Sequence, residues 1–289
     1  MSKIISIGLN LVDIYTEDQL MYPGGNELNI SVYANRLGAE SAFLGVFGTD
    51  ATVPAIQSVL REEHVDFSRC RVEEGENGNS YVKVVQGERV FTGHNNGGVT
   101  GSHPVQLNRE DLDYIRGFDV VTSSLYGRIP LAELQKLQET GVPFAYDFST
   151  LKDFMAMQKI LPLLEFGFFS CSDLSEEETV DFLWNVRQSG CRICIGTRGE
   201  NGALLFDGKQ LYRQKAIPIN VVDTMGAGDA FLASFLVNYY DALAGESKES
   251  RIVRSLSAAA VFSAQVCTQN GAIGYAFPIP SGYMLTERR

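Results

Sequence analysis

The sequence lacks any apolar run long enough to span a membrane, and its first apolar stretch meets Asn10 and Asp13 too early for a signal peptide. Internal repeats and low-complexity segments are also absent. Cysteine is sparse: the five include a single C-x-x-C, formed by Cys191 and Cys194, which is too little for a zinc site and predicts two buried thiols. Such cysteine use is typical of a reducing compartment. We therefore expect a cytoplasmic protein with no membrane partner.

Positive charge is scarce as well. The chain has 24 Lys and Arg against 35 Asp and Glu, which gives a formal net charge of -11. This balance argues against a nucleic-acid partner, and any anionic ligand must be held locally by backbone amides, helix N-termini, a metal or a few placed cations. At 289 residues and 45% hydrophobic, the chain can bury a full core. We predict a single domain over residues 1–289, with an appendage.

Short apolar runs alternate with helix-like segments along most of the chain. Strands are predicted at residues 4–9, 41–47, 118–122, 143–148, 166–170 and 191–196. Helices are predicted at residues 30–37, 51–63, 130–140, 151–161 and 175–189. This alternation predicts an α/β fold with a mostly parallel sheet covered on both faces.

One stretch breaks the alternation and reads as a hairpin. Residues 80–86 and 89–92 alternate in polarity on either side of the turn pair Gly87 and Glu88. We expect the segments 10–22 and 67–98 to combine into a small lid sheet, a common way for an α/β enzyme to exclude water.

The most informative motif is DTMGAGD at residues 223–229, between an expected strand at 216–222 and an expected helix at 230–244. Its glycines, Gly226 and Gly228, let the backbone turn tightly, so that successive amides and the helix dipole form an anion pocket. Asp229 beside such a pocket could accept the proton of an attacking hydroxyl. The amides of Gly226, Ala227 and Gly228 would then take up charge on a transferred phosphoryl group.

An ordinary strand-to-helix turn is the alternative, with Asp223 or Thr224 as the cap and Asp229 in solvent. The whole string, however, resembles the C-terminal signature of the ribokinase-like (PfkB) carbohydrate kinases. GGNELN at residues 24–29 resembles the N-terminal sugar-binding motif of that family, in the correct order; without the family, PGGN would read as a surface turn. The resemblance implies a ribokinase-like three-layer α/β/α domain with a small β-sheet lid and an ATP-dependent kinase activity.

The resemblance also implies which residues bind the two substrates. Sugar hydroxyls would be bound by Asn10, Asp13, Gly24, Gly25 and Asn29. TRGENG at residues 197–202 resembles the T-x-G-x-x-G nucleotide loop, although a hairpin turn explains its glycines equally well. ATP would be bound by Thr197, Gly199, Gly202, Thr224, Gly228 and Asn270, the last within NGAIG, which resembles a loop near adenine.

Two cation sites follow from the same comparison. Asp223 matches a position of the family's cation loop, which implies K⁺ activation. At residues 170–178 the chain lacks the Asn that many members carry three residues before a Glu. Glu177 could still organise Mg²⁺ through water, although helix capping explains these acids equally well.

Within the family, the chain is most similar to fructoselysine 6-kinases, on strings such as ERVF at residues 88–91 and YDFS at 146–149. This implies γ-phosphoryl transfer to a primary hydroxyl of a sugar or sugar-amine. Because fructoselysine is cationic, a lid acid such as Glu27 or Glu88 is a candidate partner; Glu88 could equally be an exposed hairpin acid.

Several functions remain open at this point. A fructokinase, a ribokinase, a nucleoside kinase and a non-catalytic sugar- or nucleotide-binding protein all fit the fold. Members of the family use the lid as a flap or as the clasp of a homodimer, and the hairpin does not distinguish the two.

Overall fold

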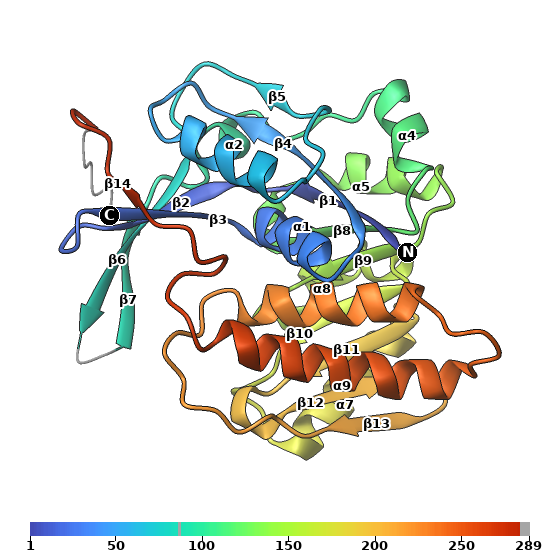
Figure 1. The fold of residues 1–289 in the computed structure, drawn as a ribbon. Coiled ribbons are helices and arrows are strands. Elements are labelled where there is room, and N and C mark those ends of the chain that lie inside the picture. Colours follow the sequence, from blue (N-terminus) through green and yellow to red (C-terminus); the bar gives the residue numbers. More distant parts are fainter. Residues whose placement is uncertain (86–87, 284–289) are drawn as a thin grey trace.

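The computed structural model describes residues 1–85 and 88–283, which contain a large and a small β-sheet (Figure 1). The strands of the large sheet are β1 (Lys3–Gly8), β4 (Glu40–Phe47), β5 (Arg71–Val72), β8 (Val120–Ser124), β9 (Phe144–Asp147), β10 (Phe166–Ser170), β11 (Ile193–Thr197), β12 (Ala203–Phe206) and β13 (Leu211–Gln214). Their order is β13-β12-β11-β10-β9-β8-β1-β4-β5. All neighbours from β11 to β5 are parallel, whereas β12 and β13 are antiparallel. The predicted mostly parallel sheet is confirmed.

Two apolar cores lie on opposite faces of this sheet. Ile4 belongs to one and the next residue, Ile5, to the other, because successive side chains of a strand alternate between faces. The first face is covered by α1 (Asn26–Arg36), α2 (Val53–Glu62), α8 (Ala227–Tyr240) and α9 (Lys248–Val266). The second is covered by α3 (Gly98–Ser102), α4 (Arg109–Ile115), α5 (Leu131–Gln138), α6 (Phe154–Met157) and α7 (Glu176–Gln188). Three short 3₁₀ turns complete the described elements: η1 (Leu125–Gly127), η2 (Leu161–Leu163) and η3 (Gly199–Asn201).

The small sheet extends from one end of the large one (Figure 1). Its strands are β2 (Leu11–Tyr15), β3 (Leu20–Gly24), β6 (Gly78–Val85), β7 (Glu88–His94) and β14 (Phe277–Pro278), in the order β14-β3-β2-β6-β7. The segments 10–22 and 67–98 supply most of this sheet, but β5 within the second segment pairs with β4 of the large sheet. Gly87 of the expected turn lies outside the described residues. The assignment of one domain with a lid stays a prediction.

Two expected elements are missing or shortened in the structure. The apolar run 216–222 forms no strand; Val221 and Val222 are 59% and 55% exposed, and Pro218 has no N–H for a ladder bond. The helix expected at 151–161 is reduced to α6 and η2, because the side chain of Asp153 caps a short turn through the N–H of Met155.

Two helices begin earlier than expected, and both shifts matter for the site. α8 begins at Ala227 rather than at residue 230, so the glycine motif forms its first turn. α1 begins at Asn26 rather than at residue 30, so GGNELN starts a helix instead of forming a surface turn.

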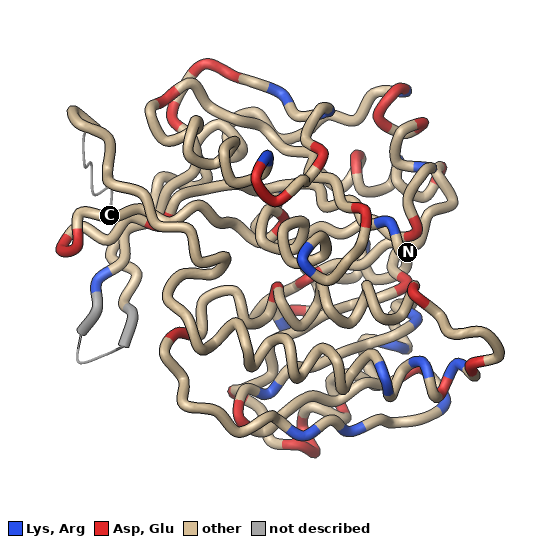
Figure 2. The backbone as a smooth tube through the Cα atoms, in the orientation of Figure 1, with Lys and Arg blue, Asp and Glu red and all other residues tan. Residues whose placement is uncertain are grey.

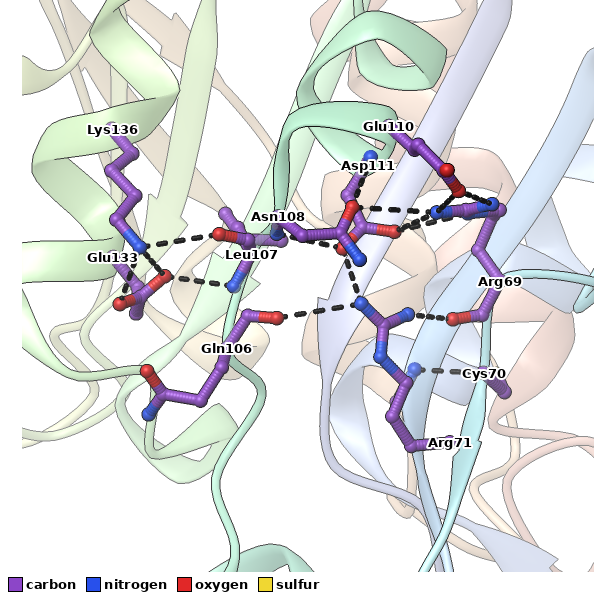
Figure 3. Close-up of polar contacts among 11 residues, drawn as sticks. Arg69, Cys70, Arg71, Gln106, Leu107, Asn108, Glu110, Asp111, Glu133 and Lys136 are labelled. Atoms are coloured by element: carbon purple, nitrogen blue, oxygen red, sulfur yellow. Dashed lines mark hydrogen bonds and ion pairs between the residues drawn. The ribbon is translucent and has the colours of Figure 1, made fainter.

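A polar network ties α4 to the segment that follows α2 (Figure 3). Asp111 is fully buried and forms a capping box with Asn108 at the start of α4. Its carboxylate also pairs with Arg69, at 2.7 Å, and with Arg71. Burial favours the neutral acid, but the hydrogen bonds from the Asn108 N–H and the two arginines leave the pKa of Asp111 below its ordinary value.

Charged positions of both signs are interspersed along the chain, with no continuous basic stripe in this view (Figure 2). All five cysteines are free, and Cys191 and Cys194 are fully buried, as predicted. Among the described residues, every helix is too short or too polar to cross a membrane.

Candidate active site

A cavity of about 1280 Å³ lies at the carboxyl ends of the parallel strands, where open α/β sheets bind their ligands. Strand ends contribute Leu9, Asp147, Ser170 and Thr197, and the small sheet contributes Asp13, Asn79, Ser80 and Phe91. The start of α8 supplies Gly226, Ala227, Gly228 and Asp229. The cavity therefore brings both sequence motifs to one place.

The Asp229 carboxylate is held by two amides of α1. The Nδ2 atoms of Asn26 and Asn29 donate to Oδ1 and Oδ2 of Asp229, at 3.0 and 2.8 Å. Asp229 is only 6% exposed and still lines the cavity. The alternative in which this acid is solvated is therefore wrong.

The environment of Asp229 changes its acidity. Burial raises the pKa of Asp229 well above its ordinary value, and the hydrogen bond from Asn29 opposes that rise. The charges of Asp147 and Glu27 raise the pKa further. A carboxylate with a raised pKa is a stronger proton acceptor, which suits a general base.

The backbone before Asp229 turns through two different glycines. Gly226 has φ 75° and caps α8, and a Cβ on it would lie 2.6 Å from the Tyr33 hydroxyl. A Cβ on Gly228 would meet nothing within 4 Å, so this part of the turn borders open space. The N–H of Ala227 already donates to Thr224 O at 3.2 Å.

The predicted sugar-binding residues divide into two groups. Asp13, Gly25 and Asn29 line the cavity. Gly24 lies behind them, since a Cβ on it would be 3.5 Å from Asp13 Oδ2 and 3.6 Å from Asn29 Oδ1. Asn10 is fully buried, donates from Nδ2 to Val46 O at 2.9 Å and is not part of the cavity wall.

Glu27 is not a lid acid, contrary to the sequence-based expectation. It lies on α1 and is fully buried, and the N–H of Leu9 donates to its Oε2 at 2.8 Å. Burial raises the pKa of Glu27 to about 7. Because Glu27 does not line the cavity, it cannot contact a substrate amine there. Glu88 begins β7, and its side chain lies outside the described part of the chain.

Most of the residues expected to bind ATP also line the cavity. Thr197, Gly199, Gly202 and Thr224 line the wall. Thr197 ends β11, and Gly199 and Gly202 belong to the turn before the antiparallel strand β12, so the loop does form a hairpin turn. Asn270 is exposed and does not line the cavity.

The two predicted cation residues lie in different surroundings. Asp223 joins two loops, because its Oδ1 accepts from Met225 N at 2.9 Å and its Oδ2 from Gly271 N at 2.7 Å. Glu177 is exposed on α7 and lies away from the cavity wall. The neighbouring Ser175 and Glu178 form a capping box, so helix capping does occur at these acids.

Several cavity residues were missed at the level of sequence. Asp147 ends β9, and burial raises its pKa to about 6. Asn79 presents a buried Oδ1 that has no hydrogen-bond partner among the described residues, and so does Asn29. Such buried acceptors favour a ligand that carries hydroxyl groups. The one available signal in the sequence was a polar residue at the end of a strand. Many positions share this feature, so it could not single out these residues.

Backbone strain is concentrated at the same cavity. Five non-glycine residues of the described chain have positive φ, and three of them, Asn96, Arg128 and Ser149, line this wall. Each such residue costs about 1–3 kcal/mol. Strain of this size clusters at functional sites, which supports the cavity as the working part of the molecule.

Comparison with known proteins identifies the family. The model of the pfkB family carbohydrate kinases matches residues 7–279. Fructosamine kinase FrlD of Bacillus subtilis is 35% identical over 279 residues, covering 96% of this chain and 94% of the relative. Fructoselysine 6-kinase of Escherichia coli is 32% identical over 240 residues, covering 83% and 90%. The Arabidopsis thaliana ribokinase structure with ribose and ATP superposes with a TM-score of 0.78 over 94% of this chain and 95% of that chain, at 20% identity.

The fold is the ribokinase-like α/β fold, as the sequence predicted. The chain belongs to the pfkB family of carbohydrate kinases and is an ATP-dependent sugar kinase.

Proposed function

We propose that this kinase transfers the γ-phosphoryl group of Mg·ATP to a primary hydroxyl of a ketoamine, the adduct of fructose with an amine. The observation that carries the proposal is the buried Asp229 carboxylate, which lies in one cavity with the predicted sugar motif and nucleotide loop. The similarity to a fructosamine kinase and a fructoselysine 6-kinase supports this acceptor class.

The proposed reaction is an in-line displacement at phosphorus. The acceptor hydroxyl oxygen forms the new P–O bond, its proton passes to Asp229, and ADP leaves with the electrons of the broken bond. Asn26 and Asn29 hold the carboxylate toward the hydroxyl. Because the amide of Ala227 is already used, the proposed anion pocket rests on Gly226 and Gly228.

We propose that Asp147, rather than Glu177, organises Mg²⁺ through water. Mg²⁺ keeps several waters and takes few protein ligands, so one well-placed carboxylate is enough. Asp147 lines the cavity, and its charge acts on Asp229, whereas Glu177 is remote. When bound, Mg²⁺ neutralises charge on the phosphates.

The remaining residues keep their proposed parts. Asp13 and Asn29 would bind sugar hydroxyls, with Gly24 and Gly25 letting the backbone approach. Asp223, which bridges two loops, remains our candidate for a K⁺ loop. Thr197, Gly199, Gly202, Thr224 and Gly228 would bind ATP, whereas Asn270 lies outside the cavity wall. A cytoplasmic setting and a homodimer through the lid also remain proposals, the first supported by five free thiols.

ADP release measured with fructoselysine, fructose, ribose and adenosine as acceptors tests the assignment. We expect the highest kcat/KM with fructoselysine. Preference for fructose, ribose or adenosine would move the protein to another activity of the family. Binding of ATP without ADP release for any acceptor would mean a non-catalytic binding protein.

A further inference from the structure

We propose that Arg128 recognises a carboxylate on the acceptor, so that the preferred substrates are ketoamines of amino acids rather than free sugars or adducts of simple amines. The inference rests on the proposed function and narrows its substrate class. Neither the sequence motifs nor the relatives' names assign a role to this residue.

Arg128 lies at the acceptor end of the cavity. It follows β8 through η1, and β8 is next to β1 but three strands from β11, whose end carries Thr197. With neighbouring strands about 4.8 Å apart, the ends of β8 and β11 are about 14 Å from each other. The Nε atom of Arg128 is 3.5 Å from where a Cβ on Gly97 would sit, just past the end of β7 in the small sheet. Arg128 therefore lies beside the small sheet and away from the nucleotide loop.

The guanidinium is also unpaired within the described part of the chain, where neither a hydrogen bond nor an ion pair engages it. Other arginines are used structurally: Arg36 pairs with Glu63, and Arg254 pairs with Glu246. An arginine that lines a cavity with its donors free presents a planar fork, which matches a carboxylate in bidentate geometry.

The backbone of Arg128 gives a second, independent indication. Its φ and ψ of 55° and 26° lie in the left-handed region, which glycine occupies at lower cost. Among other residues, Asn and Asp are the usual occupants of that region. A long cationic side chain in this conformation on a cavity wall indicates that the side chain itself is needed there.

The charge of the surroundings selects the class of ligand. The described wall of the same cavity also includes Asp13, Asn29 and Asn79, and these groups suit hydroxyls and an amine. A free ketose has no anionic group for the guanidinium. A ketoamine made from an amino acid has both an amine and a carboxylate, so it complements both kinds of residue.

The test uses pairs of acceptors that differ by one carboxylate. One pair is fructosylglycine and fructosylmethylamine, and the other is fructoselysine and fructosylcadaverine. kcat and KM are measured for the wild type, for Arg128→Gln, Arg128→Lys and, as a matched control, for Arg192→Gln. Arg192 is 73% exposed and pairs with Glu165 outside the cavity.

We expect the wild type to favour the carboxylated member of at least one pair by about ten- to hundred-fold in kcat/KM, the range of one charge-assisted hydrogen bond. Arg128→Gln should abolish that preference by raising KM for the carboxylated member. It should leave kcat/KM for the uncharged member and the melting temperature of the protein unchanged. Arg128→Lys should keep part of the preference. Arg192→Gln should behave as the wild type.

Three other results would overturn the inference. If the wild type has equal kcat/KM for both members of each pair, the kinase assignment stands, but recognition of a carboxylate is excluded. An Arg128-dependent preference for fructose 1-phosphate would mean that Arg128 binds a phosphate rather than a carboxylate. If no ketoamine is phosphorylated, the proposed function itself fails, and the inference fails with it.

Discussion

Asn29 and Asp229, 200 residues apart in the sequence, are joined by a 2.8 Å hydrogen bond from an amide to a carboxylate. The bond links α1 to α8 and thereby links the two motifs of the family. It also lowers the pKa of Asp229 against the effect of burial. Asn29 therefore has two effects on the proposed base, on its orientation and on its acidity.

Replacing Asn29 with Ala should lower kcat by about ten- to hundred-fold, because the carboxylate loses its orientation. It should also move the acid limb of the pH–rate profile to higher pH, since the bond that lowers the pKa of Asp229 is removed. Steady-state kinetics between pH 5 and pH 9 measure both effects. Asn185→Ala on the exposed side of α7 is the control, and an unchanged acid limb in Asn29→Ala would count against the assignment.

Asp147→Asn should raise the Mg²⁺ concentration for half-maximal rate by about tenfold or more, because the carboxylate proposed to orient the metal's waters is lost. Mn²⁺ binding in the presence of ATP, followed by electron paramagnetic resonance, gives a readout independent of turnover. Glu177→Gln is the matched control and should leave both measurements unchanged. If Glu177→Gln changed both measurements and Asp147→Asn changed neither, Glu177 would be the residue that organises Mg²⁺.

Glu27→Gln should make the protein more stable at alkaline pH. Burial raises the pKa of Glu27 from 4.5 to about 7, so the folded state binds more protons than the unfolded state within that interval. Stability therefore falls as pH rises through this window, by up to about 3 kcal/mol for this group. Urea unfolding at pH 5 and pH 8 should show a smaller fall in the variant than in the wild type. An equally large fall in both would mean that Glu27 is not the titrating group.

Asp111→Ala should lower the free energy of unfolding by about 2–4 kcal/mol, because a buried carboxylate that caps α4 and pairs with two arginines is removed. Asp113→Ala on the same helix removes a pair whose acid is 58% exposed, and it should cost less than about 1 kcal/mol. Thermal and denaturant unfolding compare the two variants. Similar losses would show that the network adds no more than a surface ion pair.

Much of the fold could be predicted because the local periodicity of apolar residues determines most of its strands and helices. The alternation of apolar strands and helices placed six strands of the large sheet to within a few residues. The prediction of a strand at residues 216–222 was wrong because apolar side chains that line a cavity have the same sequence pattern as a buried strand. The strand β14 is too short to produce any pattern of its own.

The site could be predicted where a motif carried it, as for Asp229, but not where it depends on contacts between distant strands. Asp147 is the last residue of β9 and Arg128 follows β8 through η1, and their shared cavity follows from strand order. Glu27 is a case in which the sequence misled. Its charge suggested an exposed lid acid, but its position at the start of α1 buries the side chain next to Leu9.

The most direct test of the central claim is the kcat of Asp229→Asn, measured with fructoselysine alongside ATP affinity and with Asp181→Asn on α7 as the control. The account predicts a fall in kcat of about a hundred- to ten-thousand-fold with ATP affinity nearly unchanged, because only the proton acceptor is lost. Near-normal turnover in Asp229→Asn would remove this carboxylate from the mechanism.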